Sequence, residues 1–148
     1  MVGQQGSDAG RMTPDEVRSM LGGLFLSERK DIDCFSMLQV WADTLGVHLP
    51  NEYKGYNQNK FIDLLKSDEL KALNLLDEYM ASLGMTNVSI PNEGDIVVVK
   101  YNKIVTVGIL YSYRHMIVST LDKGIKLVKY LPSKVLRHYN LTSCGECE

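Results

Sequence analysis

The chain has 148 residues, of which 45% are hydrophobic and 23% charged, a balance typical of one globular domain. No apolar run approaches the roughly 20 residues that a membrane helix needs, and the polar first ten residues lack the apolar core of a secretory signal. Three unevenly placed cysteines are too few for a disulfide framework. We therefore expect neither a membrane span, a secreted miniprotein nor a repeat array, but one domain over residues 13–140 between flexible polar tails.

The first half of that domain has helical periodicity. Thr13, Pro14 and Glu16 form a capping box that predicts a short helix, which we expect to pack on the body as a lid or arm. Asp33 stands at the cap position of a second helix, and Gly46 is its expected end. The buried stripe of this second helix has three-to-four spacing and comprises Cys34, Leu38, Trp41, Ala42 and Leu45.

Helical periodicity resumes over residues 60–83 and then gives way to strands. Ser67-Asp68 is expected to divide this stretch into two helices, and Gly84 to close the helical half. Short β-branched runs of strand length follow at residues 95–101, 104–111, 115–121 and 124–130. Helices followed by an antiparallel meander predict an α+β fold, with N-terminal helices packed on a four-to-five-stranded antiparallel sheet.

Charge is distributed unevenly along the chain. Residues 1–99 hold 8 basic and 15 acidic residues, a formal charge of −7, whereas residues 100–140 hold 8 basic and 1 acidic residue, or +7. A basic half can attract phosphate backbones or face an acidic surface on a neighbouring subunit. The cations alternate with Val, Ile and Leu at strand-like spacing, and no known nucleic-acid module is visible. We therefore favour a solvated or subunit-facing sheet over nucleic-acid binding.

Two segments resemble the NlpC-like cysteine peptidases, papain-fold enzymes that cut cell-wall peptides. The stretch from Asp33-Cys34 to Leu49-Pro50 is similar to the nucleophile helix of that family and its exit. Pro91-Asn92-Glu93-Gly94-Asp95-Ile96-Val97, followed by Val107-Gly108-Ile109, is similar to its first two sheet strands. The likeness covers roughly residues 30–140 and implies a papain-like fold with Cys34 at the nucleophile position.

The resemblance also implies that the catalytic machinery is incomplete. A thiol becomes a fast nucleophile when a helix N-terminus and a neighbouring imidazole stabilise its thiolate. In the family the imidazole directly precedes the Val-Gly-Ile motif, but here that residue is Thr106. The third, orienting polar residue falls at Val118 on the following strand, which is apolar. Cys34 is then a vestigial nucleophile and a small buried hydrophobe, and we expect no catalytic residues and no cofactor.

The three histidines are candidate substitutes for the missing imidazole. His48 lies at the far end of the Cys34 helix, about 20 Å along its path, and His138 follows the sheet with no expected route to the site. His115 opens the third strand, yet its odd offset from Val118 places it on the opposite face of that strand. Surface or half-buried histidines are therefore the favoured interpretation.

Cys144-Gly145-Glu146-Cys147 close to the C-terminus supplies two ligands of the type that zinc or an iron–sulfur cluster takes. A closed site needs four ligands, and the remaining cysteine, Cys34, belongs to a distant helix. The pair would need a second chain to complete the site, so we expect a plain tail and no metal.

These features favour an assembly function over an enzymatic one. Domains similar to the NlpC group occur both as free enzymes and in phage tail tips, where some have lost their catalytic residues. The leading hypothesis is a structural component of a phage tail tip or baseplate, made in the host cytoplasm and located in the virion. Its partners would be other tail proteins and copies of itself, whose opposed charges allow head-to-tail contact in a ring, with no membrane or nucleic-acid partner.

Two alternatives remain open. The first is an active cysteine peptidase or amidase that pairs Cys34 with His115 after a strand-register shift, which a bulge near Arg114 could produce. The second is a metal- or cluster-binding assembly factor that uses Cys144 and Cys147.

Overall fold

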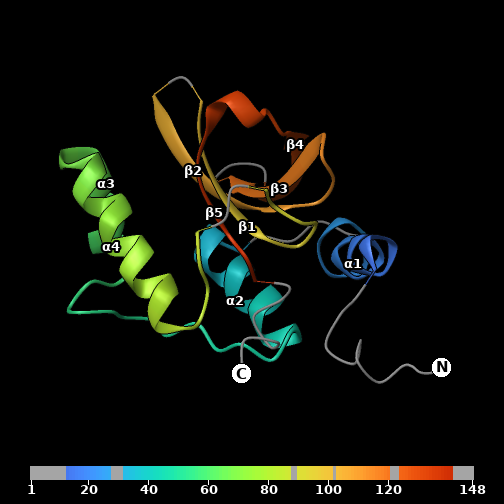
Figure 1. Ribbon diagram of the computed structural model, residues 1–148, viewed down its shortest axis with the longest axis horizontal. Coiled ribbons are helices and arrows are strands. Elements are labelled where there is room, and N and C mark those ends of the chain that lie inside the picture. The colour runs from blue at the N-terminus through green and yellow to red at the C-terminus, as the bar shows by residue number, and fades with distance from the viewer. Residues whose placement is uncertain (1–12, 28–31, 88–89, 102, 121–123, 142–148) are drawn as a thin grey trace.

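The computed structural model describes residues 13–27, 32–87, 90–101, 103–120 and 124–141, with the helices first and the strands after them (Figure 1). The helical elements are α1 (Pro14–Leu21), the π-helical turn η2 (Gly22–Leu26), α2 (Cys34–Thr44), α3 (Gln58–Ser67) and α4 (Glu69–Ser82). The strands are β1 (Ile96–Tyr101), β2 (Ile104–Leu110), β3 (His115–Thr120), β4 (Gly124–Lys129) and β5 (Val135–Tyr139), and the 3-10 turn η3 (Pro132–Lys134) precedes β5. The predicted α+β fold is confirmed. None of the helices described is long and apolar enough to cross a membrane.

The five strands form one antiparallel sheet in the order β4-β3-β2-β1-β5. The first four strands are the expected meander, and β5 joins the sheet at the free edge of β1. Four consecutive residues of β1, Ile96–Val99, are fully buried, because both faces of the sheet are covered.

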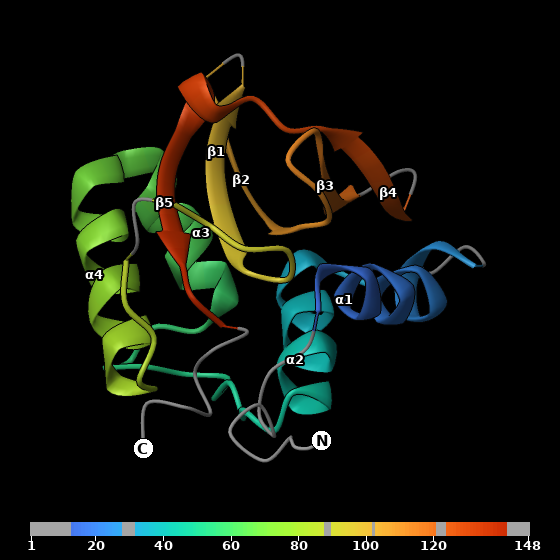
Figure 2. The same ribbon diagram turned by 45° about the vertical axis from the view of Figure 1, so that its right-hand side comes forward.

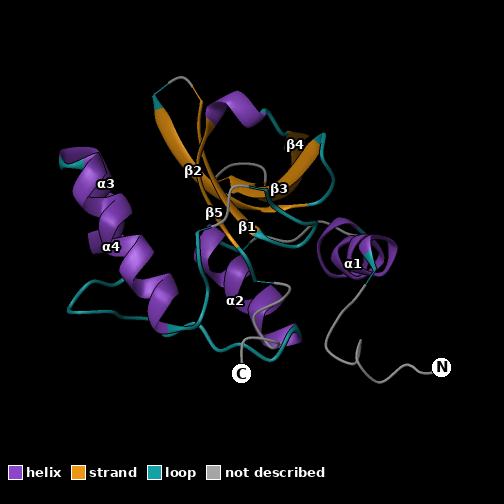
Figure 3. Ribbon diagram, viewed as in Figure 1, coloured by secondary structure: helices purple, strands orange, loops and turns teal. Residues whose placement is uncertain are grey.

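Each face of the sheet has its own apolar core. Helix α2 lies under the sheet (Figures 1, 2 and 3). Helix α1 lies on one side of α2, and the α3–α4 pair lies on the other side. The first core joins Phe25, Met37, Trp41 and Met80 of the helical half to Ile96, Val98, Ile109 and Ile117 of the sheet. The second core lies on the opposite face and comprises Val97, Val99, Leu110, Met116, Val118 and Tyr130. Alternate residues along β1 and β3 therefore belong to different cores.

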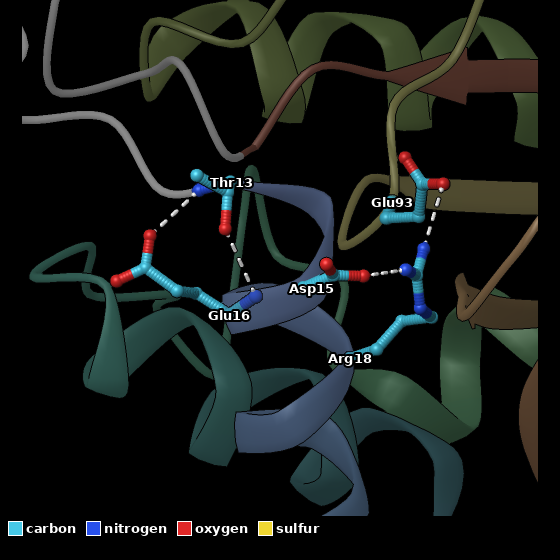
Figure 4. Close-up of polar contacts among 5 residues, drawn as sticks. All are labelled: Thr13, Asp15, Glu16, Arg18 and Glu93. Atoms are coloured by element: carbon cyan, nitrogen blue, oxygen red, sulfur yellow. Dashed lines mark hydrogen bonds and ion pairs between the residues drawn. The ribbon is translucent and has the colours of Figure 1, made fainter.

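Helix α1 begins with the predicted capping box. The N–H of Glu16 donates to Thr13 Oγ1 at 3.2 Å, and the N–H of Thr13 donates to Glu16 Oε1 at 2.9 Å (Figure 4). Helix α1 packs on the body as expected, but it is part of the core and not a lid or arm, because Val17, Leu21 and Phe25 are buried in the first core. The Gly22-Gly23 pair continues the helix as η2 and so carries Phe25 into that core.

The ends of α2, α3 and α4 follow local capping chemistry. The Asp33 carboxylate accepts from the N–H of Ser36 at 2.7 Å, and Gly46 takes a φ of +84° just beyond α2. As predicted, α3 and α4 divide at Asp68, and its carboxylate accepts from the N–H of Lys71. Helix α3 begins two residues before the expected start because Asn57 caps it, accepting from the N–H of Lys60 at 2.9 Å.

Helix α4 is tied to the sheet by pairs that join the acidic and basic halves of the chain. Lys100 Nζ lies 2.7 Å from Glu69 Oε1, and Arg137 Nε lies 3.1 Å from Asp77 Oδ2. The Tyr139 hydroxyl donates to Asp77 Oδ1 at 2.5 Å. Burial, and then this hydrogen bond, raise the pKa of Tyr139 far above its usual range. Part of the charge asymmetry is thus neutralised within the chain.

Candidate functional site

A cavity of about 760 Å³ opens between the helical half and the sheet. Its walls come from the first turn of α2, the loop at residues 50–57, one face of the α3–α4 pair, the beginning of β2 and the end of β3. The volume falls in the range of sites that bind drug-sized ligands. Most of the lining is aliphatic and aromatic, and Cys34, Thr106 and Ser119 lie on it together. This cavity is the candidate functional site.

Cys34 occupies the first turn of α2, half-buried at the wall of the cavity. Burial raises the pKa of its thiol, and the negative charge of the neighbouring Asp33 raises it further. Backbone N–H groups at the helix start lower this pKa, but by less. The Asp33 carboxylate that caps α2 thus opposes formation of the thiolate, and the thiol stays protonated near neutral pH.

The resemblance would require polar catalytic groups at the positions of Thr106 and Val118. The structure places these two residues in different surroundings. Thr106 lines the cavity, although its partner in register on β1 is Val99 of the second core. Val118 is 3% exposed in the second core, on the face of the sheet away from α2. The residues of β3 that do reach the cavity are Ser119 and Thr120, and the Ser119 hydroxyl donates to the carbonyl of Ile32 just before α2. Sequence reasoning missed Ser119 because it took the position from the family resemblance and not from the pairing of the strands.

All three histidines lie among the described residues, and none lines the cavity. His48 is exposed beyond α2, with Nδ1 4.0 Å from Asp43 Oδ1, as expected for the far end of that helix. His138 lies on β5, and its Nε2 is 2.8 Å from the hydroxyl of Tyr130. Neither residue can serve Cys34 as a base.

His115 is exposed at the start of β3, four residues from Ser119, or about 13 Å along the strand. Strand alternation gives it the face of Ser119, so it is position along the strand that separates His115 from Cys34. The register shift that the described strands show lies between Val98 and Val99, where β1 pairs with β5, and not near Arg114. Nothing in this arrangement brings an imidazole to Cys34.

Cys144 and Cys147 lie outside the described residues. Within the described residues, no group of three or more His, Cys, Asp or Glu side chains could hold a metal ion.

The Pro91–Asp95 segment, one of the two that carry the resemblance, is a structural junction. Trp41 Nε1 donates to the carbonyl of Gly94 at 2.8 Å, and Arg18 Nη1 donates to Glu93 Oε2 at 3.2 Å (Figure 4). Asp95 is fully buried and accepts from the N–H of Asn92 at 2.7 Å and from the N–H of Leu141 at 3.1 Å. The segment therefore joins α1, α2 and the chain after β5, and Leu141, expected in the C-terminal tail, belongs to the core.

Gly108, in the Val107-Gly108-Ile109 motif that also carries the resemblance, is required by packing. A Cβ at this position would lie 2.5 Å from the carbonyl oxygen of Ile117 and 2.7 Å from Met116 Cε. The glycine lets β3 approach β2 closely at the point where pairing between the two strands ends.

In comparisons with known proteins, the chain matches no family model, no curated protein and no solved structure.

Proposed function

We propose that this chain is a non-catalytic assembly component of a phage tail tip or baseplate, built on an NlpC-like domain that has lost its chemistry. One observation carries the proposal: Cys34 lies at the wall of a cavity of about 760 Å³ whose described lining includes no histidine. A protonated thiol with no imidazole cannot start acyl transfer, because the attacking group is the thiolate.

The surface charges support contact with other protein subunits. Lys100 and Arg137 are neutralised by α4, but Lys103, Arg114, Lys129 and Lys134 are exposed and have no ion-pair partner among the described residues. Asp63 on α3 and Asp43 at the end of α2 are exposed on the helical half. Opposed charges on two sides of one chain favour head-to-tail contacts, which close into a ring when the rotation permits.

Hydrolysis of cell-wall peptides by the purified chain tests the loss of chemistry. We expect no hydrolysis above that of the Cys34→Ala variant. Hydrolysis at the rate of an ordinary peptidase, abolished by Cys34→Ala and by His115→Ala, would instead establish the active enzyme.

Two further measurements test the assembly role. Velocity sedimentation at low salt should show a closed oligomer that dissociates as salt is added, since salt screens contacts between exposed charges. A monomer at every concentration would remove the ring. An antibody against the chain should label one end of the tail in virions that carry it, and label confined to host cytoplasm would contradict the location.

A further inference from the structure

Strands β2 and β3 separate where they meet the cavity. Their pairing is limited to Ile109 with Ile117 and Leu110 with Met116, whereas β1 pairs with β2 over its whole length. Beyond Gly108, residues 104–107 of β2 and residues 119–120 of β3 line the cavity instead of pairing with each other. The first half of β2 therefore has a strand neighbour on only one side within the described chain.

The wall opposite this strand edge is apolar and incompletely covered. Helix α3 has no fully buried residue, and Phe61, Ile62 and Leu65 line the cavity while only partly buried. Across the cavity Ile104, at the start of β2, is 66% exposed. A contiguous apolar surface of this kind marks a binding site, since covering it is favourable.

The two ends of the cavity differ in charge. Lys66 in the last turn of α3 and Lys103 before β2 both line it, and neither has an ion-pair partner among the described residues. Glu69 at the same end is already held by Lys100 at 2.7 Å. At the other end Glu52 lies in the loop before α3. From Gln58 to Lys66 helix α3 rises about 12 Å, which separates the two ends.

We propose that this groove binds an extended segment of a partner protein that pairs with the open edge of β2. At about 3.3 Å per residue, a groove of about 12 Å holds about four residues in a strand. Alternate apolar side chains of the segment would pack against α3, and an acidic residue would lie beside Lys66 and Lys103. Strand addition of this kind obtains affinity from the backbone and specificity from alternate side chains. The inference rests on the proposed assembly function, for which it names the partner's chemistry.

A peptide fits these features better than a lipid. An acyl chain with a carboxylate could occupy the apolar wall and reach the lysines, but it has no N–H or C=O groups to pair with residues 104–107. The open strand edge favours the peptide over the acyl chain, because unpaired backbone N–H and C=O groups beside a groove can form hydrogen bonds with the backbone of a peptide.

The first test is selection of random peptides on the full chain, followed by affinity measurement with the most enriched peptide. We expect selected sequences to alternate apolar residues and to end in Asp or Glu. The double variant Lys66→Glu/Lys103→Glu should weaken binding by roughly tenfold or more, and replacing the acidic end of the peptide by Lys should restore affinity to that variant. Lys60→Glu, an exposed change on the same helix but off the cavity, is the matched control and should leave affinity unchanged.

The second test is amide hydrogen exchange with and without the selected peptide. Exchange at the amides of Val105 and Val107, which by strand alternation point away from β1 toward the open edge, should slow on binding, while exchange in the edge strand β5 should not change. Failure to select any peptide, or binding that leaves the Val105 and Val107 amides unprotected, would overturn the proposal. Dodecanoate that binds while the selected peptide does not would assign the groove to a small amphipathic anion, and self-association lost in the double variant would assign it to a second copy. Peptidase activity would overturn the proposed function alone, since none of these binding measurements depends on Cys34 being inert.

Discussion

The junction at Pro91–Asp95 and the cavity beneath β2 differ in how many of their polar groups have hydrogen-bond or ion-pair partners and in how much of their apolar surface is covered. At the junction, buried Glu93, Gly94 and Asp95 each have a partner from a different part of the chain. At the cavity, the apolar face of α3 is only partly buried, and Lys66 and Lys103 lack ion-pair partners among the described residues. The contrast teaches that polar side chains join separate elements at the junction, whereas at the cavity apolar and charged groups are left open, as the proposed partner requires.

The largest expected difference separates two phenylalanines of the same size. Phe25 is 1% exposed in the first core, so Phe25→Ala should cost about 3–5 kcal/mol of unfolding free energy. Phe61 on α3 is only partly buried, and Phe61→Ala should cost about 1–2 kcal/mol because the part of its surface that faces the cavity is already exposed. Chemical denaturation of both variants measures this; equal losses would mean that the cavity wall belongs to the core.

Asp95 tests how strongly the junction depends on one buried carboxylate. Asp95→Ala removes the acceptor for the N–H groups of Asn92 and Leu141, and stranded buried donors should cost about 3 kcal/mol together. Asp95→Asn keeps one acceptor oxygen and should lose less. Denaturation with exposed Asp63→Ala as control measures the difference, and a neutral Asp95→Ala would show that the junction is not held by this residue.

Alanine substitutions at two glycines should have opposite effects on stability, because packing requires a glycine at only one of the two positions. Gly108→Ala should destabilise by about 1–3 kcal/mol, since its Cβ would meet the backbone of Ile117. Gly22→Ala should be neutral or stabilising by up to about 1 kcal/mol, because its φ is −60° and nothing lies within 4 Å of the added Cβ. Thermal unfolding compares them, and a stable Gly108→Ala protein would contradict the close approach of β3.

The smallest expected difference is between two ion pairs. Arg18→Ala leaves Glu93, 7% exposed, without its Arg18 partner and should cost about 1–2 kcal/mol. Lys54→Ala removes an ion pair with Glu78 in which both side chains are largely exposed, and should leave the unfolding free energy unchanged within error. If the two variants unfold at the same denaturant concentration, the Arg18–Glu93 pair adds nothing to the docking of α1.

Local signals in the sequence were sufficient for the main helices and the first four strands in their order, but they predicted no range for β5. The capping box at Thr13, the Asp33 cap and the division at Asp68 were all predictable because each depends on residues three positions apart. The role of α1 was not predictable from its length, since burial of Phe25 depends on how η2 packs against the sheet.

The candidate site was predictable only in part. Cys34 and Thr106 do line one cavity, but Val118 faces the second core and Ser119 takes its place, because strand register decides which face a residue occupies. The wall formed by α3, with Lys66 and Lys103 on the same cavity, could not be foreseen, since it depends on residues that are distant in the sequence.

The central claim is that the thiol of Cys34 is not activated, and its alkylation as a function of pH tests this most directly. In a Cys144→Ser/Cys147→Ser background, a pKa above the ordinary thiol value means that alkylation is slow at pH 7 and rises only as the pH becomes alkaline. Denaturation should remove the effect of burial and accelerate alkylation at neutral pH. Fast alkylation of the folded chain below pH 7 would contradict the account, because it would require a stabilised thiolate beside Thr106.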